Sequence, residues 1–374
     1  MTETCPLCAA PAPPPFLWRA AVPVHQNLTA ADPPAARALP QGTLAMAACT
    51  ACGFVFNRAF DAARLRYGAG YDNAQAHSPH FAGYLDALAG HLVRRGVRGL
   101  RVVEVGCGQG DFLRRLAAAG NACVGFDPAY AGPPQAGGIR YERRLYGPDC
   151  EVPADVVVCR HVIEHVADPA ALLGAIRAAL RSAPAARLFI ETPCVRAILR
   201  RRVLWDFFYE HCSLFSARTL RAALAGAGFA PGAVRHVFAG QYLLAEAMPG
   251  TAAPPAGAGS VPDLAARYGR AEPALLAGWR RRLDAMAADG GVALWGAGAK
   301  GATLAALADP DARRIDCLID VNPAKQGRFL PGTAHAILPP AALAARRVRH
   351  VVLMNDAYRA EVGAMLPAGT SLAA

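Results

Sequence analysis

The stretch RVVEVGCGQGDFLRRL, residues 101–116, decides the fold class of this 374-residue chain. RVVEVG is a short apolar strand, GCGQG is a glycine-rich turn, and the residues that follow place apolar side chains three to four apart, as an amphipathic helix does. Further apolar strands at 122–127, 155–162 and 187–193 alternate with helical segments. Such alternation predicts an α/β fold, a Rossmann-like parallel sheet covered by helices on both faces.

The glycine turn has a carboxylate on either side of it. Gly106, Gly108 and Gly110 allow the backbone to approach a cofactor closely, and Asp127 ends the next strand, where a carboxylate can hold ribose hydroxyls. NAD and S-adenosylmethionine sites share this arrangement. Glu104 favours S-adenosylmethionine, because a carboxylate at that point repels a pyrophosphate and attracts the ammonium and sulfonium groups of the methionine part.

Two C-x-x-C pairs precede this turn, CPLC (Cys5 and Cys8) and CTAC (Cys49 and Cys52). Four thiolates on two tight knuckles are typical of a tetrahedral zinc site, and four protein ligands leave no open position, so the zinc would be structural. We interpret the remaining cysteines as small core residues in a reducing compartment: Cys107, Cys123, Cys150, Cys159, Cys194, Cys212 and Cys317.

The C-terminal third contains a second glycine turn. The segment TAAPPAGAGSVPD (251–263) has the composition of a linker, and VALWGAGAKG (292–301) begins another strand–turn–helix unit. A Pro/Ala-rich insert near the N-terminus, at about 30–41, is expected to be a loop. We therefore predict three parts: a zinc-binding module at 1–66, an α/β domain with the cofactor turn at 67–250, and a smaller Rossmann-like α/β domain at 251–374.

The composition and net charge indicate which kinds of partner the protein binds. Hydrophobic residues make up 54% of the chain and the net charge is +11. Because no apolar run is long enough to span a bilayer and the N-terminus lacks the pattern of a signal peptide, we expect a cytoplasmic protein without membrane contact. The arginines are scattered and not interleaved with aromatics, which makes nucleic acid an unlikely partner and favours an anionic small molecule.

Several motifs together resemble one family. CPLC/CTAC, EVGCGQG, HVIEH, YEHCSLFS and GAGAKG…DVNPAKQGRFLPG are similar to segments of the sugar C-methyltransferases of deoxysugar pathways, over essentially the full length. The resemblance implies a zinc domain, a class I S-adenosylmethionine-dependent methyltransferase domain and a small C-terminal α/β domain. It also implies methylation of a carbon atom in a nucleotide-linked keto sugar.

The resemblance has two gaps. Where family members that act on dTDP-linked keto sugars carry a Ser- and Tyr-rich segment, this chain has YDNAQAHSPHF (71–81). Where the family has a tyrosine two positions before Glu210, this chain has Phe208, with Tyr209 next to the glutamate. The resemblance therefore supports the type of reaction more strongly than it supports the identity of the substrate.

Carbon methylation next to a ketone requires a base and a group that stabilises the enolate. By the resemblance, His211 is the general base, since imidazole titrates near neutral pH. Glu210 would orient it or polarise a hydroxyl, and Tyr209 would donate to the enolate oxygen. The alternative interpretation of Tyr-Glu-His is a hydrogen-bonded structural corner.

HVIEH spaces two histidines four residues apart, which would suit a metal, but no third ligand is evident in the sequence. We expect His161 to lie in the active site, and Glu164 and His165 to start a helix and pack there.

The only two lysines of the chain, Lys300 and Lys325, each lie near a glycine in the C-terminal part. The turn GAGAKG alone would also fit NAD. With these lysines we interpret it as an anion cradle for the nucleotide part of a substrate, and we assign Tyr71 and His77 to the substrate as well. Two other functions stay open: an O- or N-methyltransferase, and a zinc-bearing nucleic-acid-binding protein with a degenerate methyltransferase fold.

Overall fold

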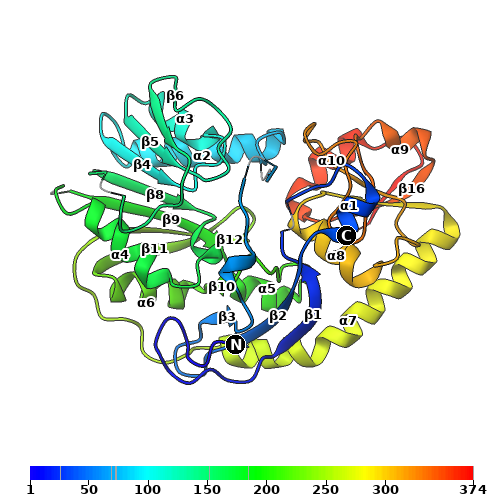
Figure 1. The fold of residues 1–374 in the computed structure, drawn as a ribbon, viewed down its shortest axis with the longest axis horizontal. Coiled ribbons are helices and arrows are strands. Elements are labelled where there is room, and N and C mark those ends of the chain that lie inside the picture. The colour runs from blue at the N-terminus through cyan, green and yellow to red at the C-terminus, as the bar shows by residue number, and fades with distance from the viewer. Residues whose placement is uncertain (26, 69, 72–73, 151, 184, 374) are drawn as a thin grey trace.

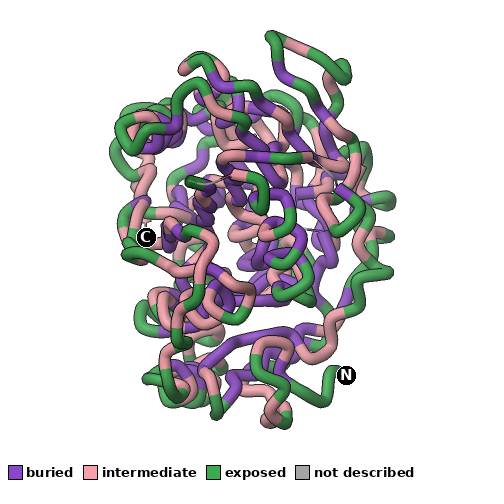
Figure 2. The backbone as a smooth tube through the Cα atoms, turned by 90° about the vertical axis from the view of Figure 1, so that its left-hand side faces the viewer, coloured by how far each residue is buried: buried purple, intermediate pink, exposed green. Residues whose placement is uncertain are grey.

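A computed structural model describes residues 1–374 except 26, 69, 72–73, 151, 184 and 374. The chain forms three sheets, one in each part of the molecule (Figure 1). Buried residues lie inside each part and exposed residues cover the outside (Figure 2). The predicted α/β fold, with a cysteine-rich N-terminal cluster, a Rossmann-like central domain and a smaller C-terminal α/β domain, is confirmed.

The central sheet has eight strands in the order β11-β12-β9-β8-β4-β5-β7-β6. Its five middle strands, β9 to β7 in that order, are parallel, whereas β6, β11 and β12 run antiparallel to their neighbours. The bounds are β4 (Arg101–Val105), β5 (Ala122–Phe126), β6 (Gln135–Ala136), β7 (Ile139–Glu142), β8 (Val156–Arg160), β9 (Arg187–Pro193), β11 (Phe229–Val237) and β12 (Tyr242–Pro249). The strands predicted from the sequence are β4, β5, β8 and β9.

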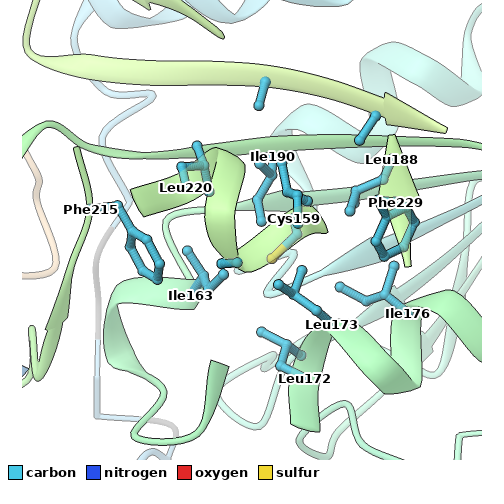
Figure 3. Close-up of a cluster of buried hydrophobic side chains, with 14 of the residues drawn as sticks. Cys159, Ile163, Leu172, Leu173, Ile176, Leu188, Ile190, Phe215, Leu220 and Phe229 are labelled. Carbon is cyan, nitrogen blue, oxygen red and sulfur yellow. The ribbon is translucent and has the colours of Figure 1, made fainter. Parts of the chain in front are cut away.

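Helices cover both faces of this sheet. On one face, α2 (Pro79–Arg94) and α3 (Asp111–Ala117) pack their apolar side chains against the strands. On the other face, α4 (Pro169–Ala179) and α6 (Ala217–Gly226) bury the cluster shown in Figure 3, where side chains of β8 and β9 meet those of the two helices. These two apolar layers hold the carboxyl ends of β4, β5 and β8 in place, and it is there that the candidate site residues lie.

The N-terminal part is an antiparallel sheet of β1 (Leu17–Pro23), β2 (Gln41–Ala48), β3 (Val55–Asn57) and β10 (Ser213–Leu214). The expectation of a loop at about 30–41 was wrong, because this segment contains α1 (Pro33–Ala38). Asp32 caps α1 by accepting from the backbone N–H of Ala35, and Pro33 suits the first helical position. Since β10 comes from the segment predicted as central, residues on both sides of position 67 build this sheet.

The C-terminal part begins with α7 (Val261–Asp289), which runs along the outside of the molecule from the first sheet to the C-terminal sheet (Figure 1). That sheet is parallel, in the order β15 (Ile337–Leu338), β14 (Cys317–Ile319), β13 (Gly291–Trp295), β16 (Val348–Leu353) and β17 (Ser371–Ala373). Its helix α8 (Ala299–Ala308) follows the second glycine turn.

The short elements complete the description of the fold. They are α5 (Val195–Arg201), α9 (Ala342–Ala345), α10 (Arg359–Met365), and the 3-10 turns η1 (Ala62–Arg64), η2 (Ile163–His165) and η3 (Asp356–Tyr358). Among the described residues, no helix combines the length and the apolar character that crossing a membrane requires.

Candidate active site

The first glycine turn has the shape that a bound cofactor requires. Gly106 has φ of 70°, and a Cβ there would lie 2.1 Å from Cγ2 of Val162. Gly108 has φ of 54° and faces open space. Asp127 holds the turn, because its carboxylate accepts from the N–H groups of Gly108 and Ala129, both at 2.8 Å. A carboxylate has about four acceptor sites, so Asp127 keeps sites for hydroxyl groups.

Glu104 carries a buried oxygen with no hydrogen-bond partner in the described part of the chain, Oε2. The side chain is 2% exposed. Burial raises the pKa of Glu104 to about 8, and the charge of Arg160 opposes that rise. An unpartnered buried acceptor is costly, so a cationic group at this point would be stabilising. The residues of the first turn therefore fit the cofactor that the sequence predicted.

His161 follows β8 directly, with φ of 53°, and lies between two buried carboxylates. Its Nε2 is 2.8 Å from Oε1 of Glu191, and its Nδ1 is 3.4 Å from Oε1 of Glu164. Burial alone would lower the pKa of His161, but the two carboxylates outweigh it and raise that pKa to about 9. His161 is thus an imidazolium at neutral pH and supplies a fixed positive charge.

A second cluster joins η2 to the segment before β10. One donor atom each from Glu164, His165 and His211 lie within 4.8 Å of one another. The rings of His165 and His211 are 4.7 Å apart, centroid to centroid. His161, the other histidine of HVIEH, is not part of this set. Glu164 and His165 lie in the 3-10 turn η2, and the structure places their donor atoms next to His211.

His211 is neutral in this environment. Burial, followed by the charge of His165, lowers the pKa of His211 to about 3. Phe208 packs on its other side, with ring centroids 4.7 Å apart. The charge of Glu164 opposes this lowering only in part, so in the protein without substrate His211 is an unprotonated and weak base whose lone pair is available.

Two tyrosines stand next to this cluster: Tyr71, which the sequence analysis assigned to the substrate, and Tyr67, which it did not single out. The hydroxyl of Tyr67 is 3.3 Å from Nδ1 of His165, and the rings of Tyr67 and Tyr71 are 5.0 Å apart. Burial raises the pKa of both tyrosines, and the charge of Glu210 adds to the rise. Both hydroxyls therefore stay protonated and can donate hydrogen bonds.

Tyr209 and His77 do not lie at the cluster of Glu164, His165 and His211. Tyr209 is fully buried in the N-terminal module, where its hydroxyl accepts from the N–H of Asp61 at 3.0 Å and its ring lies over Gly42. His77 is exposed and does not line the cavity. Neither the predicted donor to an enolate nor one of the two predicted substrate contacts is supported by this geometry.

The residues of the histidine cluster line a cavity of about 270 Å³, and all three parts of the chain contribute to its wall. That volume is near the lower end of small-molecule sites, about 300–1,000 Å³. The cavity begins at the histidine cluster and reaches the second glycine turn. Its titratable lining residues are Tyr71, His161, Glu164, His165, Arg201, Asp206, Glu210, His211, Tyr242, Lys300, Asp320, Lys325, Tyr358 and Glu361.

Both lysines line the cavity and are held by polar groups. Nζ of Lys300 donates to Asp206 and to Gln241, the latter at 3.3 Å. Nζ of Lys325 donates to Oδ1 of Asn27 at 3.1 Å and lies deeper in the protein. Ion pairing and hydrogen bonds thus fix two cationic groups beside a helix N-terminus, α8, that has no side-chain cap.

The four N-terminal cysteines converge. Their Sγ atoms all lie within 4.8 Å of one another, with Cys5 to Cys52 at 3.7 Å and Cys8 to Cys49 at 3.6 Å. A tetrahedron with Zn–S bonds of about 2.3 Å has edges of about 3.8 Å. These sulfurs therefore fit a closed four-thiolate metal site. The other seven cysteines are buried, as the sequence predicted.

Comparisons with known proteins agree with this geometry. A family model described as a methyltransferase domain matches residues 77–233, and one described as a C-methyltransferase C-terminal domain matches residues 277–369. Among curated proteins, none matches the chain.

Solved structures of other proteins are similar to parts of the chain. Magnesium protoporphyrin IX methyltransferase from Synechocystis PCC 6803 with bound SAH is 19% identical, with 45% of this chain and 82% of that chain covered and a TM-score of 0.36. N,N-8-amino-8-demethyl-D-riboflavin dimethyltransferase from Streptomyces davawensis is 24% identical, with 46% and 55% covered and a TM-score of 0.36.

The matched domains and the first glycine turn together define the class: the protein is an S-adenosylmethionine-dependent methyltransferase. Beyond the domain that binds the methyl donor, it carries the C-terminal domain found in C-methyltransferases.

Proposed function

We propose that the enzyme methylates a carbon atom next to a ketone in a nucleotide-linked sugar. One observation carries this proposal: a single cavity contains both the histidine–carboxylate cluster and the cationic second glycine turn. The cluster offers a base for enolisation, and the turn with its lysines offers a cradle for a diphosphate. An O- or N-methyltransferase needs no enolisation of its substrate, and a nucleic-acid-binding protein needs no such enclosed cavity.

The reaction divides into proton removal and methyl transfer. His211, neutral and buried, takes the proton from the carbon next to the ketone, and Glu164 stabilises the imidazolium that forms. Glu210 helps to orient the substrate. Tyr71 donates a hydrogen bond to the enolate oxygen in place of Tyr209, and the fixed charge of His161 stabilises the same oxygen. S-adenosylmethionine, held at the first glycine turn, would supply the methyl group to that carbon, and the residues of the site would position the two.

The cofactor occupies the first glycine turn in this proposal. S-adenosylmethionine supplies the electrophilic methyl group. Asp127 holds the ribose hydroxyls, the backbone at Gly106, Gly108 and Gly110 lies along the cofactor, and Glu104 accepts from the ammonium. This assignment is supported by the free acceptor sites of Asp127 and by the unpartnered oxygen of Glu104.

We also assign zinc to the four cysteines, as a structural ion that closes the N-terminal module. The domain limits at 66 and 250 remain our proposal for the chain's organisation, with β10 as a segment of the central part that completes the first sheet.

The test is a panel of keto and non-keto sugar nucleotides incubated with S-adenosylmethionine carrying a ¹³C-labelled methyl group. The expected product gains one methyl, and NMR shows the labelled carbon bonded to carbon. Without S-adenosylmethionine, the keto substrate should exchange the proton on that carbon with deuterium from the solvent. A product with the label bonded to oxygen or nitrogen, and no exchange, would overturn the proposal in favour of the alternative methyltransferase.

Changing Lys300 to alanine is expected to raise the KM for the sugar nucleotide by roughly 10–100-fold, because a charge-assisted contact is lost. S-adenosylmethionine binding should be unchanged, since Lys300 contacts Asp206 and Gln241 and no residue of the first turn. Steady-state kinetics and calorimetry measure the two effects. Arg200→Ala, which removes an exposed charge outside the cavity, is the control. Equal KM values in both variants would contradict a diphosphate cradle.

The affinity for S-adenosylmethionine is expected to weaken as the pH falls from 8 to 6.5. With a pKa of about 8, Glu104 is mostly protonated over this range and must release a proton to accept from the ammonium. The limit is about tenfold per pH unit for one proton. Calorimetry in buffers of different ionisation enthalpy measures both the affinity and the proton release. Glu104→Gln should bind more weakly and lose the pH dependence; a wild-type affinity that is flat or rises toward acid would contradict the assignment.

A further inference from the structure

Arg160 is a buried arginine that the reaction described above does not use. It is the last residue of β8, and its side chain is 10% exposed. Its Nε donates to Oε2 of Glu191 at 3.3 Å, and its guanidinium lies over the ring of Phe112, 4.6 Å from the ring centre. One nitrogen, Nη2, is buried and has no hydrogen-bond partner in the described part of the chain.

A buried hydrogen-bond acceptor lies on the neighbouring strand, β4. Oε2 of Glu104 is also buried and without a partner among the described residues. Glu104 belongs to β4, which pairs with β8 so that Glu104 is opposite Val158. Arg160 is two residues beyond Val158, so its side chain leaves the sheet on the same face as that of Glu104, and its charge opposes the rise of the Glu104 pKa. A buried donor and a buried acceptor thus lie on neighbouring strands, near the strand ends that lead to the first glycine turn and to His161.

Such a pair has the charges needed for a zwitterion. The methionine end of S-adenosylmethionine carries an ammonium and a carboxylate on the same carbon atom. We propose that Glu104 and Arg160 form a clamp for this end, in which Oε2 of Glu104 accepts from the ammonium and Nη2 of Arg160 donates to the carboxylate. This inference deepens the proposed function and rests on its assignment of the cofactor to the first turn.

The position of Arg160 supports this role over a purely structural one. Phe112 is the second residue of α3, so the guanidinium is held against the start of the helix that follows the glycine turn. Glu191 compensates part of the charge through Nε and leaves Nη2 available. A hydrogen bond from an arginine to a carboxylate is among the stronger polar contacts, particularly where water is excluded.

The experiment compares three ligands that differ only at the methionine end. S-adenosylhomocysteine has both groups, 5′-deoxy-5′-(3-aminopropylthio)adenosine keeps the amine alone, and 5′-methylthioadenosine has neither. Calorimetry gives the dissociation constant of each ligand for the wild type, Arg160→Gln and Glu104→Gln. Arg95→Gln, which breaks an exposed pair with Glu246 on the same domain, is the control.

We expect Arg160→Gln to weaken S-adenosylhomocysteine by roughly 10–100-fold and to leave 5′-methylthioadenosine within about twofold. The ligand with the amine alone should lose less than S-adenosylhomocysteine, and only because the pKa of Glu104 rises when the charge of Arg160 is removed. Glu104→Gln should weaken both ligands that carry the amine and spare 5′-methylthioadenosine. Arg160→Lys keeps the charge and loses the fork, so it should give an intermediate loss with S-adenosylhomocysteine alone.

Two results would overturn the clamp. An equal loss for all three ligands in Arg160→Gln and in Arg160→Lys would make Arg160 a structural residue that only compensates its buried neighbours. Unchanged affinity for S-adenosylhomocysteine would exclude contact with the carboxylate. Either result leaves the cofactor assignment intact, whereas a wild type that binds no S-adenosylhomocysteine would overturn the proposed function itself.

Discussion

Replacement of His211 by asparagine is expected to lower the rate of methyl transfer by roughly 10²–10⁴-fold, the usual contribution of a general base. Asparagine is similar in size and can form hydrogen bonds, but it cannot take up a proton. S-adenosylmethionine should bind to the variant within about twofold of the wild type, because His211 contacts His165 and Phe208 and no residue of the first glycine turn. Single-turnover kinetics with the keto substrate and calorimetry with the cofactor measure the two effects.

Isotope exchange separates proton removal from methyl transfer in the same variant. Without S-adenosylmethionine, the wild type should exchange the acidic proton of the substrate with solvent deuterium, and His211→Asn should not. His91→Asn, on the outer side of α2, is the matched control. Full exchange in His211→Asn would show that another group is the base, and Glu210 and His165 would be the next to test.

The fold could be predicted from local patterns in the sequence. A strand, a glycine turn and a helix follow one another within residues 101–116, and each pattern is visible without long-range information. The four strands that were predicted lie side by side in the middle of the sheet, where both faces are buried and the sequence is therefore continuously apolar. The helix α1 was missed because alanine and proline also suit a loop, and the cap at Asp32 went unnoticed.

The histidine cluster could not be predicted in the same way. His165 and His211 are far apart in sequence, and they meet only because η2 turns back after β8 and β10 joins the N-terminal sheet. Tyr209 could not be excluded from the sequence either, because the chain bends at residues 209 and 210 and no strand periodicity applies there. Phe208, Glu210 and His211 line the cavity, whereas Tyr209 is buried in the N-terminal module.

The N-terminal module holds the catalytic segment from both sides. Before Glu210 and His211, Tyr209 is anchored by Asp61 and Gly42. After them, the carbonyl of Cys212 accepts from the N–H of Asn57 at 2.9 Å, and Ser213 pairs with Phe56. The proposed base, His211, is therefore positioned by a sheet that belongs mostly to the module, and not only by the central domain.

The cysteine knuckle is continuous with that sheet. The N–H of Cys49 donates to the carbonyl of Phe54, and Phe54 leads directly into β3, the strand that pairs with β10. The ring of Phe54 also packs against Phe215, with centroids 5.0 Å apart. A metal ion that fixes the knuckle thus fixes, through one strand, the segment that carries His211.

Cys49→Ser is accordingly expected to lose the metal, lower the melting temperature and reduce methyl transfer together. Metal binding is coupled to folding in such modules, and a loss of about 3 kcal/mol would lower the melting temperature by roughly 6–12 °C. Elemental analysis, calorimetry and kinetics measure the three effects, with Cys317→Ser, a buried cysteine outside the metal set, as control. The wild type should contain one zinc ion per chain.

The location of the defects in Cys49→Ser shows whether the N-terminal module positions His211 or folds independently of the active site. If the ion acts through β3 and β10, hydrogen exchange in Cys49→Ser should rise at residues 209–214 as well as in the module, and kcat should fall while S-adenosylmethionine still binds. A variant without metal that keeps the wild-type kcat would contradict the coupling. A second ion per chain in the wild type would have a different meaning, because Glu164, His165 and His211 are the remaining described set of donors close enough to hold it. His211 would then be a ligand and the proton would go to Glu210, a distinction that the exchange experiment on both variants resolves.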